Sequence, residues 1–172
     1  LMFDTLGSSR NSTSFIVTEP NPVAVTGMDS PVGGSIALET FEYGTSKWLQ
    51  NRNDYFFTLI PDELLGCLKT TSYESTYYTN VSFTLSEDCE VYAFYHQLKP
   101  DLVTVLDEMS FDPIDTTMIL GMASPYNTNF SYSHTFYVRK RIFSKGTHVF
   151  PSLGQSIHNP TVFITLAFKP LN

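Results

Sequence analysis

The two cysteines, Cys67 and Cys89, are the residues of this 172-residue chain whose positions most directly suggest chemistry. Residues 67–73 have the composition of a strand, and residues 81–86 alternate apolar and polar side chains as a half-buried strand does. If these strands form a hairpin, Cys67 lies beside the end of the second strand, within reach of Cys89. Bridged cysteines have Cα atoms about 5–6 Å apart, so this register predicts a disulfide and an oxidising, extracytoplasmic compartment. Two buried free thiols are the alternative.

The histidines and the short motifs offer no arrangement typical of catalysis or metal binding. No two of the four histidines have the spacing of a metal-binding pair on a strand or a helix. The sequence contains no Cys-x-x-Cys, no Gly-x-Ser-x-Gly elbow and no phosphate-binding loop. We therefore expect no catalytic residue, no metal ligand and no cofactor, and the chain is not predicted to be an enzyme. The histidines are His96, His134, His148 and His158.

An acidic group in the second half of the chain has two further interpretations. Carboxylates on a loop could bind Ca²⁺, and a carboxylate pair could serve a glycosidase, although the spacing here matches no recognised motif. A solvated acidic loop is the interpretation that we favour. The members of the group are Asp107, Glu108, Asp112 and Asp115.

Aromatic residues in turns and loops could bind sugars. Tyr77 and Tyr78 fall in the predicted hairpin turn, and Tyr132 falls in a predicted loop. Their rings could stack on sugar rings, or they could pack on the ends of the fold, which is the favoured alternative. Three sequons begin at Asn11, Asn80 and Asn129 and would fit a secreted glycoprotein.

The net charge excludes one class of partner. A formal charge of -7 and a pI near 4.9 would repel nucleic-acid phosphates. No run of about 18 apolar residues is present, so no segment is predicted to span a bilayer.

Short strands must position these residues. The chain contains 14 Phe and 10 Tyr, with Gly and Pro scattered between short apolar runs, which is typical of an all-β protein. We predict an antiparallel β-sandwich, immunoglobulin-like or jelly-roll, with about eight to ten strands and at most one or two short helices. Residues 136–143 and 147–150 are expected to form a hairpin. The other predicted strands are 14–18, 23–26, 35–43, 55–60, 90–95, 116–120 and 161–168, and the helical segments are 62–65 and 98–109, with a loop and a strand as the alternative for 98–109.

The N-terminus is predicted to be an extension, residues 1–13, attached to a single sandwich domain, residues 14–172. Its apolar tip is followed by a polar spacer and then by a strand, an arrangement that could complete a neighbour's sheet. Head-to-tail donation of this kind would give an open filament, although pairing within the same molecule is the alternative. The donor residues would be Leu1, Met2, Phe3, Leu6, Phe15, Ile16 and Val17.

Turn and core positions from residue 60 onward carry a family resemblance. They are Pro61, Leu64, Gly66, Phe83-Thr84-Leu85-Ser86, Val91-Tyr92, Tyr95, Phe143, Gly146 and residues 162–166. In these positions the chain resembles a β-sandwich module of secreted bacterial proteins, sometimes appended to polysaccharide-degrading enzymes. The resemblance implies the fold more than an activity. Relatives carry an Asn/Asp-rich turn where this chain has Ser72-Tyr73-Glu74.

Two functions from different classes follow. The first, which is the function that we predict, is an extracellular or cell-surface structural subunit whose partners are copies of itself, in general plan similar to donor-strand-exchange pilus subunits. The second is a monomeric carbohydrate-binding or adhesion module of a secreted protein, with glycans as partners.

Overall fold

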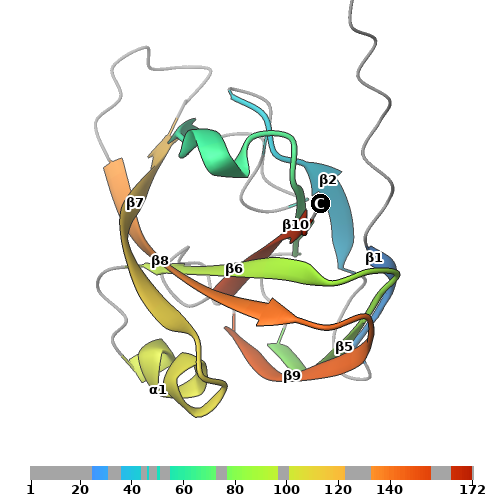
Figure 1. Cartoon of the computed structure of the whole chain (residues 1–172). Helices are drawn as coiled ribbons and strands as arrows, with labels where there is room; N and C mark the ends of the chain where they lie inside the picture. Colours follow the sequence, from blue (N-terminus) through green and yellow to red (C-terminus); the bar gives the residue numbers. More distant parts are fainter. Residues whose placement is uncertain are drawn as a thin grey trace, which may run out of the picture.

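Ten strands in two antiparallel sheets make up most of the described chain (Figure 1). The computed structural model describes residues 25–30, 36–43, 46, 50, 55–72, 77–96, 101–122, 133–155 and 164–171. The strands are β1 (Val25–Asp29), β2 (Ala37–Thr40), β3 (Tyr55–Leu59), β4 (Leu68–Thr71), β5 (Tyr77–Leu85), β6 (Cys89–His96), β7 (Asp112–Met122), β8 (Ser133–Phe143), β9 (Gly146–Gln155) and β10 (Ile164–Pro170). A 3-10 turn, η1 (Asp62–Leu64), and one helix, α1 (Asp101–Glu108), complete the elements.

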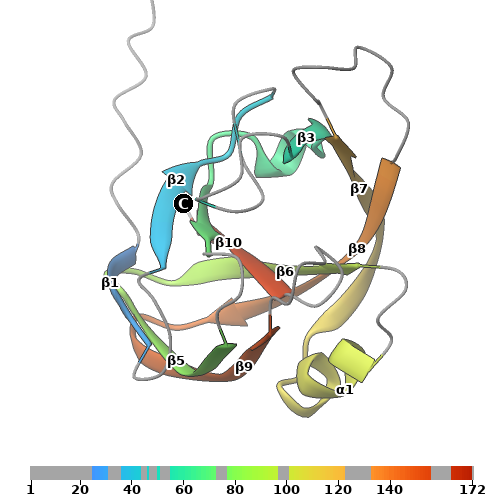
Figure 2. The same ribbon diagram turned by 180° about the vertical axis from the view of Figure 1, so that it is seen from behind.

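The larger sheet has the strand order β2-β4-β10-β6-β8-β7-β3, and the smaller sheet has the order β1-β5-β9. Figures 1 and 2 show that the larger sheet is strongly curved. The backbone N–H of Phe57 on β3 donates to the carbonyl of Ser46, in the segment after β2, at 3.3 Å. The two edges of the larger sheet therefore approach each other on its concave face.

Phenylalanines fill the concave face. The Phe41 and Phe57 ring centroids are 5.1 Å apart, and each lies 5.7 Å from Phe94 on the central strand β6. Since Phe41 and Phe57 come from opposite edges of the sheet, these edge-to-face and stacked contacts hold the curl closed.

The convex face packs against the smaller sheet. Phe83 of β5 contacts Phe143 of β8 and Phe168 of β10, with ring centroids 5.5 and 5.3 Å apart. Neighbouring residues of a strand point to opposite faces, so β6 supplies side chains to both cores. Every β6 residue except Glu90 is buried, and the prediction that this run is a central strand is confirmed.

Helix α1 continues the cover of the convex face beside β9 (Figure 2). Leu102 and Leu106, one turn apart, are its buried residues, as expected of a helix with one apolar stripe. The chain leaves the helix at Ser110, which has a left-handed φ of 57°. The predicted helix is confirmed, with bounds 101–108 in place of 98–109.

The β-sandwich prediction is confirmed, but two predicted pairings are wrong. β4 pairs with β2 and β10, and β5 pairs with β1 and β9, so they do not form a hairpin. β8 pairs with β6 and β7, whereas β9 pairs with β5 in the other sheet. Gly146, with φ 134°, lies where the chain passes between the sheets, a conformation that favours glycine.

Residues 1–17, which contain the predicted donor segment, lie outside the described part of the chain. Within the described part, no helix has the length and apolar character needed to cross a membrane.

The predicted disulfide between Cys67 and Cys89 is wrong: both cysteines are buried free thiols. β10 lies between them, because it pairs with β4 on one side and with β6 on the other. Two strand spacings amount to roughly 9–10 Å, beyond the reach of a disulfide. The Cys67 Sγ lies 3.7 Å from the carbonyl oxygen of Glu63, and the Cys89 Sγ lies 3.5 Å from that of Glu87.

We predict that both thiols react with iodoacetamide in denaturant without any reductant, adding two labels by mass. In the native protein at pH 8 the reaction should be slow, because burial raises both pKa values, that of Cys89 to about 11, and the thiolate is the reactive form. A fraction that takes up label only after reduction would contradict the free-thiol assignment.

Candidate functional site

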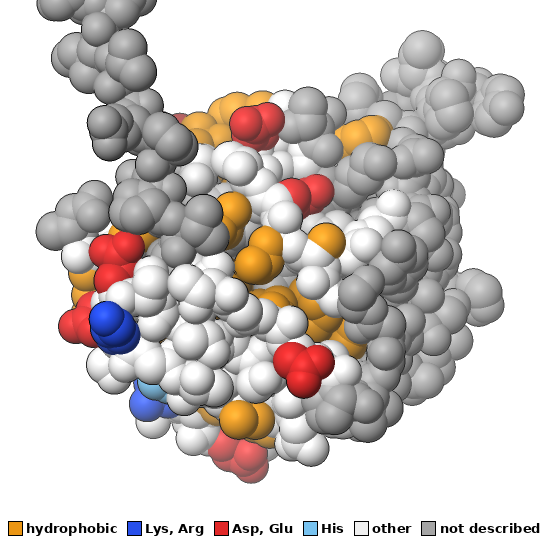
Figure 3. All heavy atoms as spheres, turned by 90° about the vertical axis from the view of Figure 1, so that its right-hand side faces the viewer, with side chains coloured by type: hydrophobic (Ala, Val, Ile, Leu, Met, Phe, Trp, Pro, Cys, Tyr) orange, Lys and Arg blue, Asp and Glu red, His pale blue; other side chains and the backbone are white. Residues whose placement is uncertain are grey.

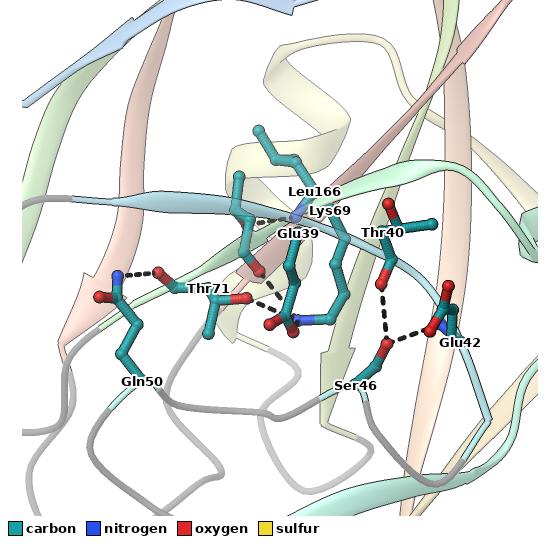
Figure 4. Close-up of polar contacts among 9 residues, drawn as sticks. Glu39, Thr40, Glu42, Ser46, Gln50, Lys69, Thr71 and Leu166 are labelled. Carbon is teal, nitrogen blue, oxygen red and sulfur yellow. Dashed lines mark hydrogen bonds and ion pairs between the residues drawn. The ribbon is translucent and has the colours of Figure 1, made fainter. Parts of the chain in front are cut away.

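Lys69 of β4 is fully buried on the concave face of the larger sheet, with 0% of the residue exposed. Its Nζ lies 2.5 Å from Glu39 Oε1 on β2, and it donates to Thr71 Oγ1 at 2.8 Å. Figure 4 shows the three side chains converging where β2 and β4 run side by side. A buried charge is tolerated when it is both paired and hydrogen-bonded, and Lys69 meets both conditions.

Aromatic rings complete the surroundings of this amine. Nζ lies 5.8 Å from the ring centroids of both Phe41 and Phe57, a distance at which a cation is attracted to a ring face. Burial lowers the pKa of Lys69 to about 8, although the ion pair and hydrogen bond with Glu39 oppose that shift. The amine is enclosed, so it stabilises the fold and presents no reactive group to a substrate.

Hydrogen bonds tie the segment after β2 to the same place. The Ser46 hydroxyl accepts from the Glu42 N–H at 2.6 Å and donates to the Thr40 carbonyl at 3.1 Å. Gln50 Nε2 donates to the Thr71 carbonyl at 2.5 Å (Figure 4). The ion pair and these hydrogen bonds secure the edge of the sheet that meets β3.

A second polar group lies on the same face. A row of register partners crosses five neighbouring strands, and its members share the concave face because directly opposite residues share a face. The row consists of Glu39, Lys69, Ala167, Tyr92 and Lys140. At the far end of this row, Lys140 Nζ lies 2.7 Å from Glu90 Oε1, and the Tyr92 hydroxyl donates to the other Glu90 oxygen.

These groups neutralise one another. Burial alone would raise the pKa of Glu90, but the hydrogen bonds from Lys140 and Tyr92 lower it. Burial, followed by the hydrogen bond to Glu90, raises the pKa of Tyr92. Glu90 is thus a stable acceptor in a fixed network, and the arrangement has the properties of a structural ion pair.

The histidines and acidic residues that the sequence singled out are dispersed. His96 is buried with its ring edge-on to Phe136, and the His148 Nε2 contacts the Ser144 carbonyl at 2.7 Å. Among the described residues, no group of three His, Cys, Asp or Glu could hold a metal ion. Asp107 instead pairs with Arg139. The His134 side chain and His158 lie outside the described part.

The sugar-stacking prediction is wrong for Tyr78, which is fully buried on β5. The Tyr77 side chain and Tyr132 lie outside the described part. An exposed tyrosine that the sequence analysis did not select is Tyr137 on β8. The alternation of Tyr137 with the buried Phe136 and Val138 was the signal that could have identified it.

Of the three sequon asparagines, Asn80 is described, and it is exposed on β5 with φ 49°. Asparagine tolerates this left-handed conformation better than most residues. Asn11 and Asn129 lie outside the described part.

The fold defines an antiparallel β-sandwich with a strongly curved larger sheet. No protein-family model matches the sequence, and a search of curated proteins finds no significant match. A solved structure with this fold is that of a β-glucuronidase from glycoside hydrolase family 2, with a TM-score of 0.61 and 12% sequence identity. The match covers 84% of this chain and 14% of the glucuronidase chain. At this identity the likeness shows the fold alone.

We predict that replacing Lys69 by Met removes a pH-dependent part of the free energy of unfolding. In the wild type, folding lowers the pKa of Lys69 from 10.5 to about 8. Between these values the unfolded state binds more protons, so wild-type stability should rise with pH relative to Lys69→Met. The difference should change by about 1–3 kcal/mol between pH 8 and 10.5, measured by urea denaturation.

Glu39→Gln is the matched variant. Removing the carboxylate removes the attraction that holds the pKa of Lys69 up, so the pH-dependent window should begin lower. A wild-type minus Lys69→Met difference that stays constant from pH 8 to 10.5 would contradict this account.

Proposed function

We propose that this chain is a non-catalytic carbohydrate-binding module of a secreted or cell-surface protein. The observation that carries the proposal is the fold match to 14% of a β-glucuronidase, a protein whose name states that it acts on glycosides. A unit of this size and fold therefore occurs inside an enzyme that handles sugars. The likeness of the sequence to modules appended to polysaccharide-degrading enzymes points in the same direction.

The polar clusters support binding over catalysis. Lys69 is enclosed by Glu39, Thr71 and two phenylalanine rings, and Glu90 is engaged by Lys140 and Tyr92. A nucleophile or general base must reach its substrate, and these groups are occupied with one another. The exposed sequon residue Asn80 supports a secreted location.

The outer surface supports a neutral ligand over a polyanion. Figure 3 shows acidic side chains spread over one face, with Lys and Arg side chains gathered at one margin and hydrophobic side chains in small separate groups. Together with the formal charge of -7, this distribution disfavours phosphate-rich or sulfate-rich partners.

We predict that the whole chain is retarded in affinity gel electrophoresis by at least one neutral polysaccharide among β-glucans, mannans and xylans. Isothermal titration with the matching hexasaccharide should give a saturable curve, and bovine serum albumin serves as the non-binding control. Unchanged mobility in all neutral and acidic polysaccharides would count against the proposal.

Strand donation into a filament is the second candidate, favoured by one feature of the fold. β1, the first described strand, forms an edge of the smaller sheet, and sheet edges are where strands are added.

We predict that deleting residues 1–6 abolishes any self-association seen by sedimentation velocity while leaving the circular dichroism spectrum unchanged. A full chain that sediments as a monomer at high concentration would exclude this candidate.

A further inference from the structure

Tyr137 presents a half-exposed aromatic ring on the convex face of the larger sheet, with 45% of the residue exposed. Its register partners are Tyr95 on β6 and Thr117 on β7. The Tyr95 ring is nearly buried, and its centroid lies 5.9 Å from that of Tyr137 at an interplanar angle of 57°. A fixed neighbouring ring restricts the motion of Tyr137, so a ligand that stacks on it loses little side-chain entropy.

An ion pair between Arg139 and Asp107 lies near this ring. Arg139, two residues along β8 and therefore on the same face, contacts the Asp107 carboxylate of α1 and donates to the Phe111 carbonyl at 3.3 Å. The Asp107 side chain is 60% exposed, while the Arg139 side chain is mostly buried. The guanidinium thus holds the carboxylate in place while much of the carboxylate remains open to solvent.

Two further polar groups border the ring. Thr117, directly opposite Tyr137 on β7, is exposed. The Nε of Arg139 is buried and has no hydrogen-bond partner among the described residues. Because this nitrogen is inaccessible to solvent, a ligand at the surface does not reach it, and Arg139 contributes to the site by positioning the Asp107 carboxylate.

On the basis of the proposed function, we infer that Tyr137, Asp107, Arg139 and Thr117 form a binding site for a neutral pyranose on the convex face. A pyranose has a C–H face that can lie on an aromatic ring and a rim of hydroxyls that both donate and accept. Tyr137 supplies the ring, the Asp107 carboxylate positioned by Arg139 accepts from sugar hydroxyls, and Thr117 can donate to them.

Local charge selects the class of sugar. The Asp107 carboxylate lies in the site and Glu108, also exposed, is the next residue of α1, whereas Asp112 is the register partner of Lys140 on the concave face. The whole chain carries a formal charge of -7. This excess of negative charge would repel a uronate or a sulfated sugar, so the ligand is neutral.

The test uses the whole chain with cellohexaose, laminarihexaose and mannohexaose as neutral probes and hexagalacturonate as the acidic probe. Tyr137→Ala should weaken binding of the best neutral probe by about tenfold or more, whereas Tyr137→Phe, which keeps the ring, should bind within about twofold of wild type. Asp107→Asn should also weaken binding, because a carboxylate is the stronger acceptor. Ile142→Ala is the control, since Ile142 is 61% exposed on the same strand but on the opposite face.

The possible outcomes distinguish a failure of the proposed site from a failure of the proposed function. If the wild type binds a neutral probe and neither Tyr137→Ala nor Asp107→Asn weakens it, the site is wrong and the function stands. If the wild type binds the acidic probe alone, the charge argument fails and the site is overturned. If no probe or polysaccharide binds, the proposed function fails as well. Should Tyr137→Ala not fold, Asp107→Asn carries the test, because it changes an exposed side chain.

Discussion

The charge of Lys69 is stable inside the larger sheet because Glu39, on the adjacent strand, lies 2.5 Å from the amine. The ion pair also fixes the register of β2 against β4. A shift of β2 by one residue would turn Glu39 to the other face and leave the amine buried without an anion, which is strongly destabilising. The register of β2 therefore sets where Phe41 lies, and Phe41 is the residue that meets Phe57 from the opposite edge. The ion pair therefore supports the curl of the sheet together with the phenylalanine contacts and the hydrogen bond from Phe57 to Ser46.

The curl in turn decides where a ligand can bind. The concave face is occupied by phenylalanine rings and by two polar clusters whose groups satisfy one another. The convex face is only partly covered, by the smaller sheet and by α1. A strand such as β8 therefore has one face in the core and one face that emerges beyond the cover, where Tyr137 becomes exposed. The proposed site lies on the convex face of the larger sheet because side chains already fill the concave face.

The pattern of apolar and polar residues predicted the strands and the helix well, because burial of one or both faces of an element requires apolar residues at fixed spacings. The run in β6 and the stripe of Leu102 and Leu106 in α1 are examples. Which strands pair with one another could not be predicted in the same way. The sequence predicts that Cys67 and Cys89 lie on neighbouring strand ends, because the two segments are close in sequence. In the structure β10, from the end of the chain, lies between their strands. Such an insertion leaves no trace near either cysteine. Tyr78 was not assigned to the core because β5 begins at Tyr77, where the sequence predicts a turn, and a register shift between Tyr78 and Thr79 breaks the alternation with Val81. The alternation around Tyr137 has no such interruption.

The proposed site at Tyr137 is open to solvent. Catalysis requires a dry, enclosed arrangement in which charged groups act on the reacting atoms, whereas the Asp107 carboxylate is largely open to water. Solvent would compete for every hydrogen bond of a sugar bound there, so the proposed site would give a modest affinity for a single sugar chain. Tethering two binding modules raises the affinity of the pair, because the tether raises the effective concentration of the second module at the polysaccharide. The physical requirement on the proposed site is then only that the surface on which the sugar rests be rigid. The ring of Tyr95 and the Arg139–Asp107 pair meet that requirement.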